Sequence, residues 1–190
     1  MIETIPMFAV PLMIQRSEIG HMAIEDYVRE KINGFDDYTS YHDQVFNKEM
    51  EDGQPFRKEM EEDMLALTHY FLRARGADED TIAQGKLGWW YSMYYEGQDH
   101  HLHTHPRALC AGTYYPYANE RSSPIKFRHP SSTIIGHAES WSPKSRTPDY
   151  IHKPTTGDML VWPCWLEHEV RVERNVRVDE ERIAISWNYQ

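Results

Sequence analysis

The sequence predicts a mainly β fold in which helices near the N-terminus support an antiparallel sandwich or barrel. From about Leu87, short runs rich in Tyr, Trp, Ile and Val follow one another, separated by Gly, Pro and Asn. Two earlier segments have helical periodicity, and 190 residues suit one sizeable core. We therefore expect a single domain. Residues 1–86 would hold an N-terminal strand, the supporting helices and a loop, and residues 87–190 the β core.

Two amphipathic helices are expected in the first half of the chain. In residues 21–34, apolar side chains recur at i, i+3, i+4 and i+8, and Gly34 follows as a stop signal. Residues 58–76 have a similar apolar face and end at Gly76. Residues 35–56, between the two, mix aromatic and acidic side chains without a clear period, so we expect a loop that covers a site as a lid.

Runs typical of short strands fill the second part of the chain. Many short strands at this spacing favour a sandwich or barrel over alternating β and α units. Five of their aromatic residues fit either the wall of a pocket or ordinary core, namely Trp89, Trp90, Tyr94, Tyr95 and Trp162. The runs are residues 87–95, 108–117, 124–130, 149–154, 157–163, 168–173 and 182–189.

Composition and charge exclude several classes of protein. Hydrophobic residues make up 40% of the chain and charged residues 26%, as in a globular protein, and no apolar run approaches the roughly 20 residues that cross a membrane. The N-terminus lacks the basic start and unbroken apolar centre of a secretory signal, so we expect a cytoplasmic protein without a membrane partner. Cys110 and Cys164 form no disulfide framework, and both are expected to be free thiols inside strands.

The formal net charge of −10 is unevenly placed along the chain. Residues 1–80 hold 18 acidic against 8 basic residues, whereas residues 81–190 hold 12 of each. An acidic half repels phosphate backbones. Sequence-independent binding to nucleic acid is therefore disfavoured.

The stretch HHLHTHPRALCAGTYY begins at His100 and places four histidines in six positions. Side chains two residues apart on an extended strand lie on the same face, so an HxH pair can offer two imidazoles to one metal ion. His101 with His103, His103 with His105, and His100 as an additional member are the alternatives. A third ligand should come from a distant strand, and His168, which begins HEVRVE, is the best candidate.

Arg182 begins the run RIAISWN, in which alternate residues separate into two faces. One face is fully apolar, with Ile183, Ile185 and Trp187, and the other carries Arg182, Ala184, Ser186 and Asn188. An arginine in this setting suits a carboxylate inside a barrel, because a guanidinium makes bidentate, charge-assisted hydrogen bonds.

Together these motifs resemble the 2-oxoglutarate and Fe(II)-dependent oxygenase superfamily, in its bacterial and phage group. HTHP followed by AGTYY, then GDMLVWPCWLEHEV, then RIAISWN occur in the order of that group's motifs, over about residues 87–190. The resemblance implies a double-stranded β-helix, or jelly roll, a cupin-like barrel with helices supporting one sheet. It also implies a dioxygenase (hydroxylase) that couples oxidative decarboxylation of 2-oxoglutarate to succinate with C–H oxidation. Its cofactors would be Fe(II), the cosubstrate 2-oxoglutarate, and O2.

The resemblance assigns an iron site to three residues. His103 and His105 match the first motif and His168 matches the distal one. His105 departs from the commonest pattern of the superfamily, which has a carboxylate there and forms a triad of two histidines and one carboxylate. Either the iron site uses three histidines, or a nearby acid such as Asp99 takes a place. His100 falls outside the motif and is expected beside the ligands or in solvent.

A cosubstrate site is implied in the same way. Arg182 matches the basic residue that holds the distal carboxylate of 2-oxoglutarate, and Ser186 and Tyr115 are candidates for additional hydrogen bonds to it. Protein side chains and small metabolites are favoured over nucleic acid as the primary substrate because of the acidic first half. A homodimer is among the assemblies that the sequence allows.

Cupins offer an alternative for part of the sequence. HTH follows Gly97 by five residues, and a glycine and a proline precede His168 with cupin-like spacing. The cupin glutamate is absent from its place near Leu109, and Arg182 has no role in that scheme. A cupin-type metal enzyme that does not use 2-oxoglutarate, or a non-catalytic metal- or ligand-binding barrel, are the alternatives to the oxygenase.

Overall fold

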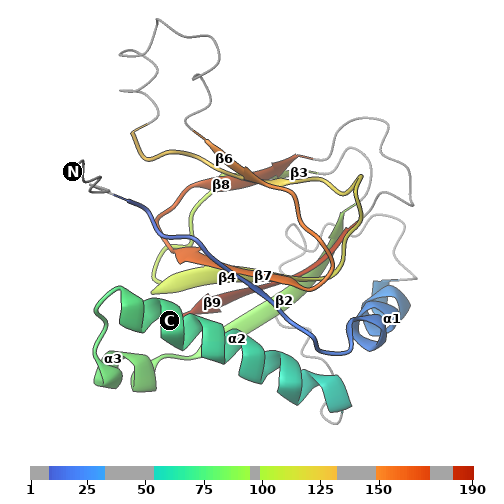
Figure 1. The fold of residues 1–190 in the computed structure, drawn as a ribbon, viewed down its shortest axis with the longest axis horizontal. Helices are drawn as coiled ribbons and strands as arrows, with labels where there is room; N and C mark the ends of the chain where they lie inside the picture. Colours follow the sequence, from blue (N-terminus) through green and yellow to red (C-terminus); the bar gives the residue numbers. More distant parts are fainter. Residues whose placement is uncertain (1–8, 33–53, 95–98, 132–148, 172–181) are drawn as a thin grey trace, which may run out of the picture.

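Two antiparallel sheets face each other in the computed structural model of the chain, which describes residues 9–32, 54–94, 99–131, 149–171 and 182–190. The five-stranded sheet has the order β1-β7-β4-β9-β2, and the four-stranded sheet has the order β3-β8-β5-β6. Figure 1 shows the helices on the outer side of the five-stranded sheet, with the four-stranded sheet on its other side. The fold class is therefore the double-stranded β-helix that the sequence predicts.

Every strand-like run of the sequence analysis contains a strand. The five-stranded sheet consists of β1 (Met13–Arg16), β2 (Leu87–Tyr94), β4 (Cys110–Tyr117), β7 (Asp158–Pro163) and β9 (Arg182–Tyr189). The four-stranded sheet consists of β3 (Asp99–His103), β5 (Ile125–Phe127), β6 (Tyr150–His152) and β8 (His168–Arg171). The predicted free thiol in a strand is confirmed for Cys110 but is wrong for Cys164, which lies half-buried in the turn after β7.

The helices are α1 (His21–Ile32), α2 (Pro55–Ala74) and α3 (Glu79–Gln84). Helix α2 begins three residues before the predicted start, because Pro55 has the backbone angle of a first helical residue and needs no hydrogen-bonded N–H there. It ends at Ala74, and the predicted stop signal Gly76 follows with a φ of +84°, which is strained for other residues. The Gly76 N–H donates to Arg73 O and the Ala77 N–H to Leu72 O, which is a Schellman cap.

Two layers of core side chains follow from the alternation along the strands. Outward-facing residues such as Ile185 and Trp187 pack against the helices, and inward-facing residues such as Leu160 and Ala184 pack between the sheets. This division confirms the predicted two faces of the RIAISWN strand. Gly112 lies on the outward face, because a Cβ there would come within 2.2 Å of the Trp187 ring.

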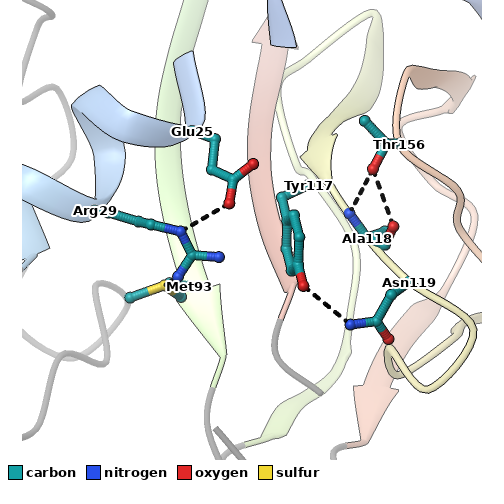
Figure 2. A network of polar contacts seen from close by, with 7 residues as sticks. All are labelled: Glu25, Arg29, Met93, Tyr117, Ala118, Asn119 and Thr156. Carbon is teal, nitrogen blue, oxygen red and sulfur yellow. Dashed lines mark hydrogen bonds and ion pairs between the residues drawn. The ribbon is translucent and has the colours of Figure 1, made fainter. Parts of the chain in front are cut away.

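Helix α1 is attached to the end of the five-stranded sheet by a polar network (Figure 2). Arg29 donates to Glu25 at 2.8 Å, lies 3.9 Å from the Met93 sulfur, and has its guanidinium carbon 4.9 Å from the centre of the Tyr117 ring. Beyond β4, Thr156 exchanges hydrogen bonds with the Ala118 backbone at 3.0 and 2.9 Å. These contacts hold the end of β4 in place, and Tyr115, near that end, points into the interior between the sheets.

The predicted lid and the predicted absence of a membrane span concern other parts of the chain. The predicted lid over residues 35–56 lies outside the described residues, apart from its last three, two of which begin α2. Within the described ranges, no helix is long and apolar enough to span a membrane.

Candidate metal centre

Three histidines from two strands and one loop converge between the sheets. His103 ends β3 and is opposite His168, which begins β8. His105 lies two residues beyond β3, and its backbone N–H donates to Cys164 O at 2.8 Å, which ties this loop to the turn before β8. One ring nitrogen from each histidine lies within 4.8 Å of those of the other two. The structure thus brings together the three residues that the sequence predicts as ligands.

Backbone carbonyls set the orientation of two of these rings. His103 Nδ1 lies 2.6 Å from His101 O, and His168 Nδ1 lies 3.0 Å from Leu166 O. Because a carbonyl oxygen only accepts, each Nδ1 carries the proton and each Nε2 keeps its lone pair for a metal ion. The side chain of Asn188 lies near His105 and acts to raise its pKa, against the larger effect of burial.

Burial keeps these imidazoles uncharged at neutral pH. It lowers the pKa of His105 to about 4, with a further contribution from His103, and it lowers the pKa of His168 well below its ordinary value. The pKa of His103 is lowered as well, again chiefly by burial. Neutral imidazole is the form that binds metal ions.

The geometry of the three histidines fits a divalent transition metal. His105 Nε2 and His168 Nε2 are 3.1 Å apart. Two nitrogens on neighbouring positions of an octahedral site, each about 2.1 Å from the metal, would be about 3.0 Å apart. Imidazole ligands suit iron, zinc, copper and nickel. Among the described residues no carboxylate joins this group, and the side chain of Asp99 lies outside them.

Arg182 faces the same interior from the start of β9. Only 3% of its surface is exposed, and Nη1 donates to the Tyr115 hydroxyl and to Ser123 O, both at 3.2 Å. The guanidinium carbon lies 5.2 Å from the centre of the Tyr115 ring. Burial raises the pKa of Tyr115, so its hydroxyl stays a neutral donor and acceptor. Tyr115 therefore holds a permanently charged group in a fixed place within the interior.

A narrow cavity between the two sheets joins the histidines to Arg182. The His105 ring lies 6.4 Å from that of Trp162, which pairs with Ala111 opposite Asn188 near the end of β9. Arg182 begins that strand, so the two groups lie toward opposite ends of its inward face. Ser186 lies between them, with its hydroxyl 3.4 Å from Thr113 Oγ1. A metal at one end and a cation at the other fit a small dicarboxylate that also has a metal-chelating group. Trp90 and Trp162 line this cavity, and Trp162 also belongs to the core between the sheets, whereas Trp89 packs in the core under the helices.

His100, which was expected beside the ligands or in solvent, lies beside the ligands. It lines the cavity, and its ring stacks on that of His103 at 3.9 Å and 19°. Burial lowers its pKa to about 3, followed by the effects of His103, His105 and the Arg182 charge. His101, by contrast, is exposed. Parity along a regular strand gives no signal for this, because it places His101 rather than His100 beside His103.

Comparison with known proteins agrees with this geometry. A model of the family described as "Putative 2OG-Fe(II) oxygenase" matches residues 88–188, which include every residue that lines the cavity. No curated protein matches the chain in sequence. The family match favours the oxygenase over the cupin-type alternative.

Solved structures share the fold at low sequence identity. The prolyl-4-hydroxylase of Pseudomonas putida has a TM-score of 0.58 at 10% identity, over 95% of this chain and 92% of that one. The viral collagen prolyl hydroxylase vCPH of Paramecium bursaria Chlorella virus-1 has a TM-score of 0.56 at 11% identity, over 100% and 98%. Iron-bound HygX of Streptomyces hygroscopicus has a TM-score of 0.51 at 11% identity, over 95% and 82%.

Proposed function

This chain belongs to the 2OG-Fe(II) oxygenase family, and from that membership we propose that His103, His105 and His168 hold the iron and Arg182 holds the cosubstrate. The protein is a 2-oxoglutarate-dependent dioxygenase that uses Fe(II), 2-oxoglutarate and O2. The observation that carries the residue roles is the convergence of three imidazole nitrogens and one buried guanidinium on a single narrow cavity.

The three histidines act as neutral ligands in fixed orientations. The backbone carbonyls on His103 Nδ1 and His168 Nδ1 leave Nε2 as the donor atom, so the rings need little rearrangement on binding. Three protein ligands leave coordination positions for a chelating cosubstrate and O2. Once bound, the iron supplies the activation of O2 for C–H oxidation.

Arg182 fixes the far end of the cosubstrate. Its guanidinium can form two parallel hydrogen bonds with one carboxylate, and burial strengthens them because water is excluded. Tyr115 orients the guanidinium through its hydroxyl, and Ser186 presents a hydroxyl on the path between Arg182 and the histidines. We assign both residues hydrogen-bonding roles toward 2-oxoglutarate.

Substitution of Arg182 separates cosubstrate binding from metal binding. In Arg182→Ala, the Kd for 2-oxoglutarate should rise at least about 30-fold, because a buried carboxylate loses its charged partner at a cost of about 2 kcal/mol or more. The Kd for Fe(II) alone should stay within about threefold of the original value. Anaerobic titration of the Fe(II) protein with 2-oxoglutarate measures this through the visible absorption of the chelate. The exposed Arg121→Ala is the matched control.

Substitution of the histidines tests the iron site. His168→Ala should abolish both Fe(II) binding and succinate formation, whereas unchanged succinate formation would remove His168 from the site.

Asp99→Ala should keep its Fe(II) affinity if three histidines suffice. A Kd for Fe(II) that rises by about 100-fold in this variant would add a carboxylate to the ligand set. An Arg182→Ala variant with an unchanged 2-oxoglutarate titration would favour a barrel that does not use this cosubstrate.

We further propose a small metabolite or a protein side chain as the primary substrate. The charge excess of residues 1–80, 18 acidic against 8 basic side chains, would repel a phosphate backbone. The free thiols of Cys110 and Cys164 fit a reducing compartment such as the cytoplasm. Activity on a neutral substrate should accordingly depend little on ionic strength compared with that of a nucleic-acid enzyme.

A further inference from the structure

An irregularity in β3 places His100 on the inner face beside His103. The pairing of β3 with β8 joins His100 to Val170 and His103 to His168, so three steps on one strand match two on the other. Such a bulge breaks the alternation of side chains. Val170 and His168 both line the cavity, and so do the residues opposite them. His100 and His103 therefore face inward although they are three residues apart.

His100 occupies the wall of the cavity next to a proposed iron ligand and within electrostatic reach of Arg182. Its ring is nearly parallel to that of His103, with 3.9 Å between the centroids. The charge of Arg182 acts on His100, as do the neighbouring histidines. A cosubstrate that joins the metal to the guanidinium must pass this wall. An imidazole offers at least one N–H donor in either protonation state.

We propose that His100 is a further binding residue for 2-oxoglutarate, and that it donates a hydrogen bond from the wall beside His103 to a carboxylate of the cosubstrate. This inference rests on the proposed function of the site. It assigns two distinct roles to neighbouring histidines of one strand, since His103 binds the metal and His100 binds the molecule that chelates it. His101, on the exposed side of the bulge, has neither role.

The decisive variant is His100→Phe, which keeps a flat ring on His103 and removes the N–H donor. A hydrogen bond to a charged group contributes about 1.5–3 kcal/mol, so the Kd for 2-oxoglutarate should rise about 10- to 100-fold. The Kd for Fe(II) measured without cosubstrate should stay within about threefold. Both constants come from anaerobic titrations of purified full-length protein, the second by competition with a chromophoric chelator. His101→Phe is the matched control and should change neither constant.

A second variant keeps the inference testable if His100→Phe does not fold. His100→Asn loses the stacking ring but retains a side-chain N–H, so it should lose less 2-oxoglutarate affinity than His100→Ala does. Equal losses in the Asn and Ala variants would overturn the hydrogen-bonding role. So would a His100→Phe protein that binds 2-oxoglutarate as tightly as the original.

Different results would contradict the proposed function and the role of His100. If the original protein with Fe(II) does not bind 2-oxoglutarate, the proposed function is wrong. If it binds 2-oxoglutarate and Arg182→Ala weakens that binding, but His100→Phe does not, only the role of His100 is wrong. A His100→Phe protein that loses Fe(II) and 2-oxoglutarate affinity in parallel would likewise overturn it, since His100 would then only support His103.

Discussion

At the residue scale, Gly112 in β4 lies opposite Trp187 in β9 and leaves room for the indole ring. A Cβ at Gly112 would lie 2.2 Å from two atoms of the indole and 2.7 Å from Leu160 O. Trp187 is fully buried, so its ring has no space into which to move. This single glycine lets a large indole fill the layer between the sheet and the helices.

Gly112→Ala should therefore lower the free energy of unfolding by about 3 kcal/mol or more, because one inserted methyl displaces a fully packed ring. Urea unfolding followed by tryptophan fluorescence measures the change. Gly88→Ala in β2 of the same sheet is the matched control, since a Cβ there has no atom within 4 Å and should change stability by less than about 1 kcal/mol. Equal effects of the two substitutions would contradict the close approach at Gly112.

Individual site residues differ in how far the sequence alone could identify them. The spacing of His103, His105 and His168 and the alternation around Arg182 carry local signals, and the structure brings these residues onto one cavity. His100 carries no such signal, because a bulge depends on pairing with a strand almost 70 residues away. Which of several adjacent histidines faces inward is thus decided by the partner strand.

At the element scale, α2 is joined to β9 by a buried hydrogen bond. The Trp187 indole N–H donates to Thr68 Oγ1 at 3.0 Å, and neither residue has exposed surface. The bond fixes the rotation of the helix about its axis, since Thr68 must point at one indole. It also gives the fully buried Trp187 indole a polar partner, without which its N–H would be buried and unsatisfied.

Thr68→Val should lower the free energy of unfolding by about 1–3 kcal/mol, because it keeps the shape of the side chain and leaves the indole N–H without an acceptor. Thr68→Ser retains the hydroxyl and should lose less. Thermal and urea unfolding of the two variants give the comparison. If Val were tolerated better than Ser, the methyl group rather than the hydrogen bond would determine the packing of α2.

Elements could be predicted where their periodicity is long and could not where it is short. Helix α2 has an apolar face over five turns, and its C-terminal glycine is recognisable. Helix α3 spans only Glu79–Gln84 and buries a single apolar residue, Ile82, so no period emerges. Its capping signal was present, since Asp78 accepts a hydrogen bond from the Thr81 N–H at 2.7 Å. The order of strands in each sheet depends on long-range pairing and left no local trace.

At the scale of the whole molecule, the polar groups of the site lie between two sheets rather than on a surface. The outer face of the five-stranded sheet is covered by helices, so its apolar residues supply much of the core. Its inner face carries Arg182 among apolar residues, and it faces the histidines of β3, of β8 and of the loop after β3. Burying these groups costs stability that the outer layer offsets. That residues 1–190 form one domain stays a prediction, and a single cooperative unfolding transition would support it.

The buried histidines should make the stability of the metal-free protein depend on pH. The pKa values of His100 and His105 are lowered by burial to about 3 and about 4, from an unfolded value of 6.5. Below pH 6.5 the unfolded chain therefore binds protons that the folded chain does not. The stability that the two neutral imidazoles contribute to the folded protein is fully present above pH 6.5, and it is lost as the pH falls toward their folded pKa values.

Between pH 6.5 and 5.5 these two imidazoles should together lower the free energy of unfolding by about 2 kcal/mol, and His103 and His168 act in the same direction. Urea unfolding of chelator-treated protein at pH 7.5, 6.5 and 5.5 measures the slope. In His105→Asn the loss over this interval should shrink by about 1 kcal/mol, whereas the exposed His101→Asn should leave it unchanged. A free energy of unfolding that stays constant over this range would mean that the imidazoles take up protons in the folded state, and hence that the cavity is open to water.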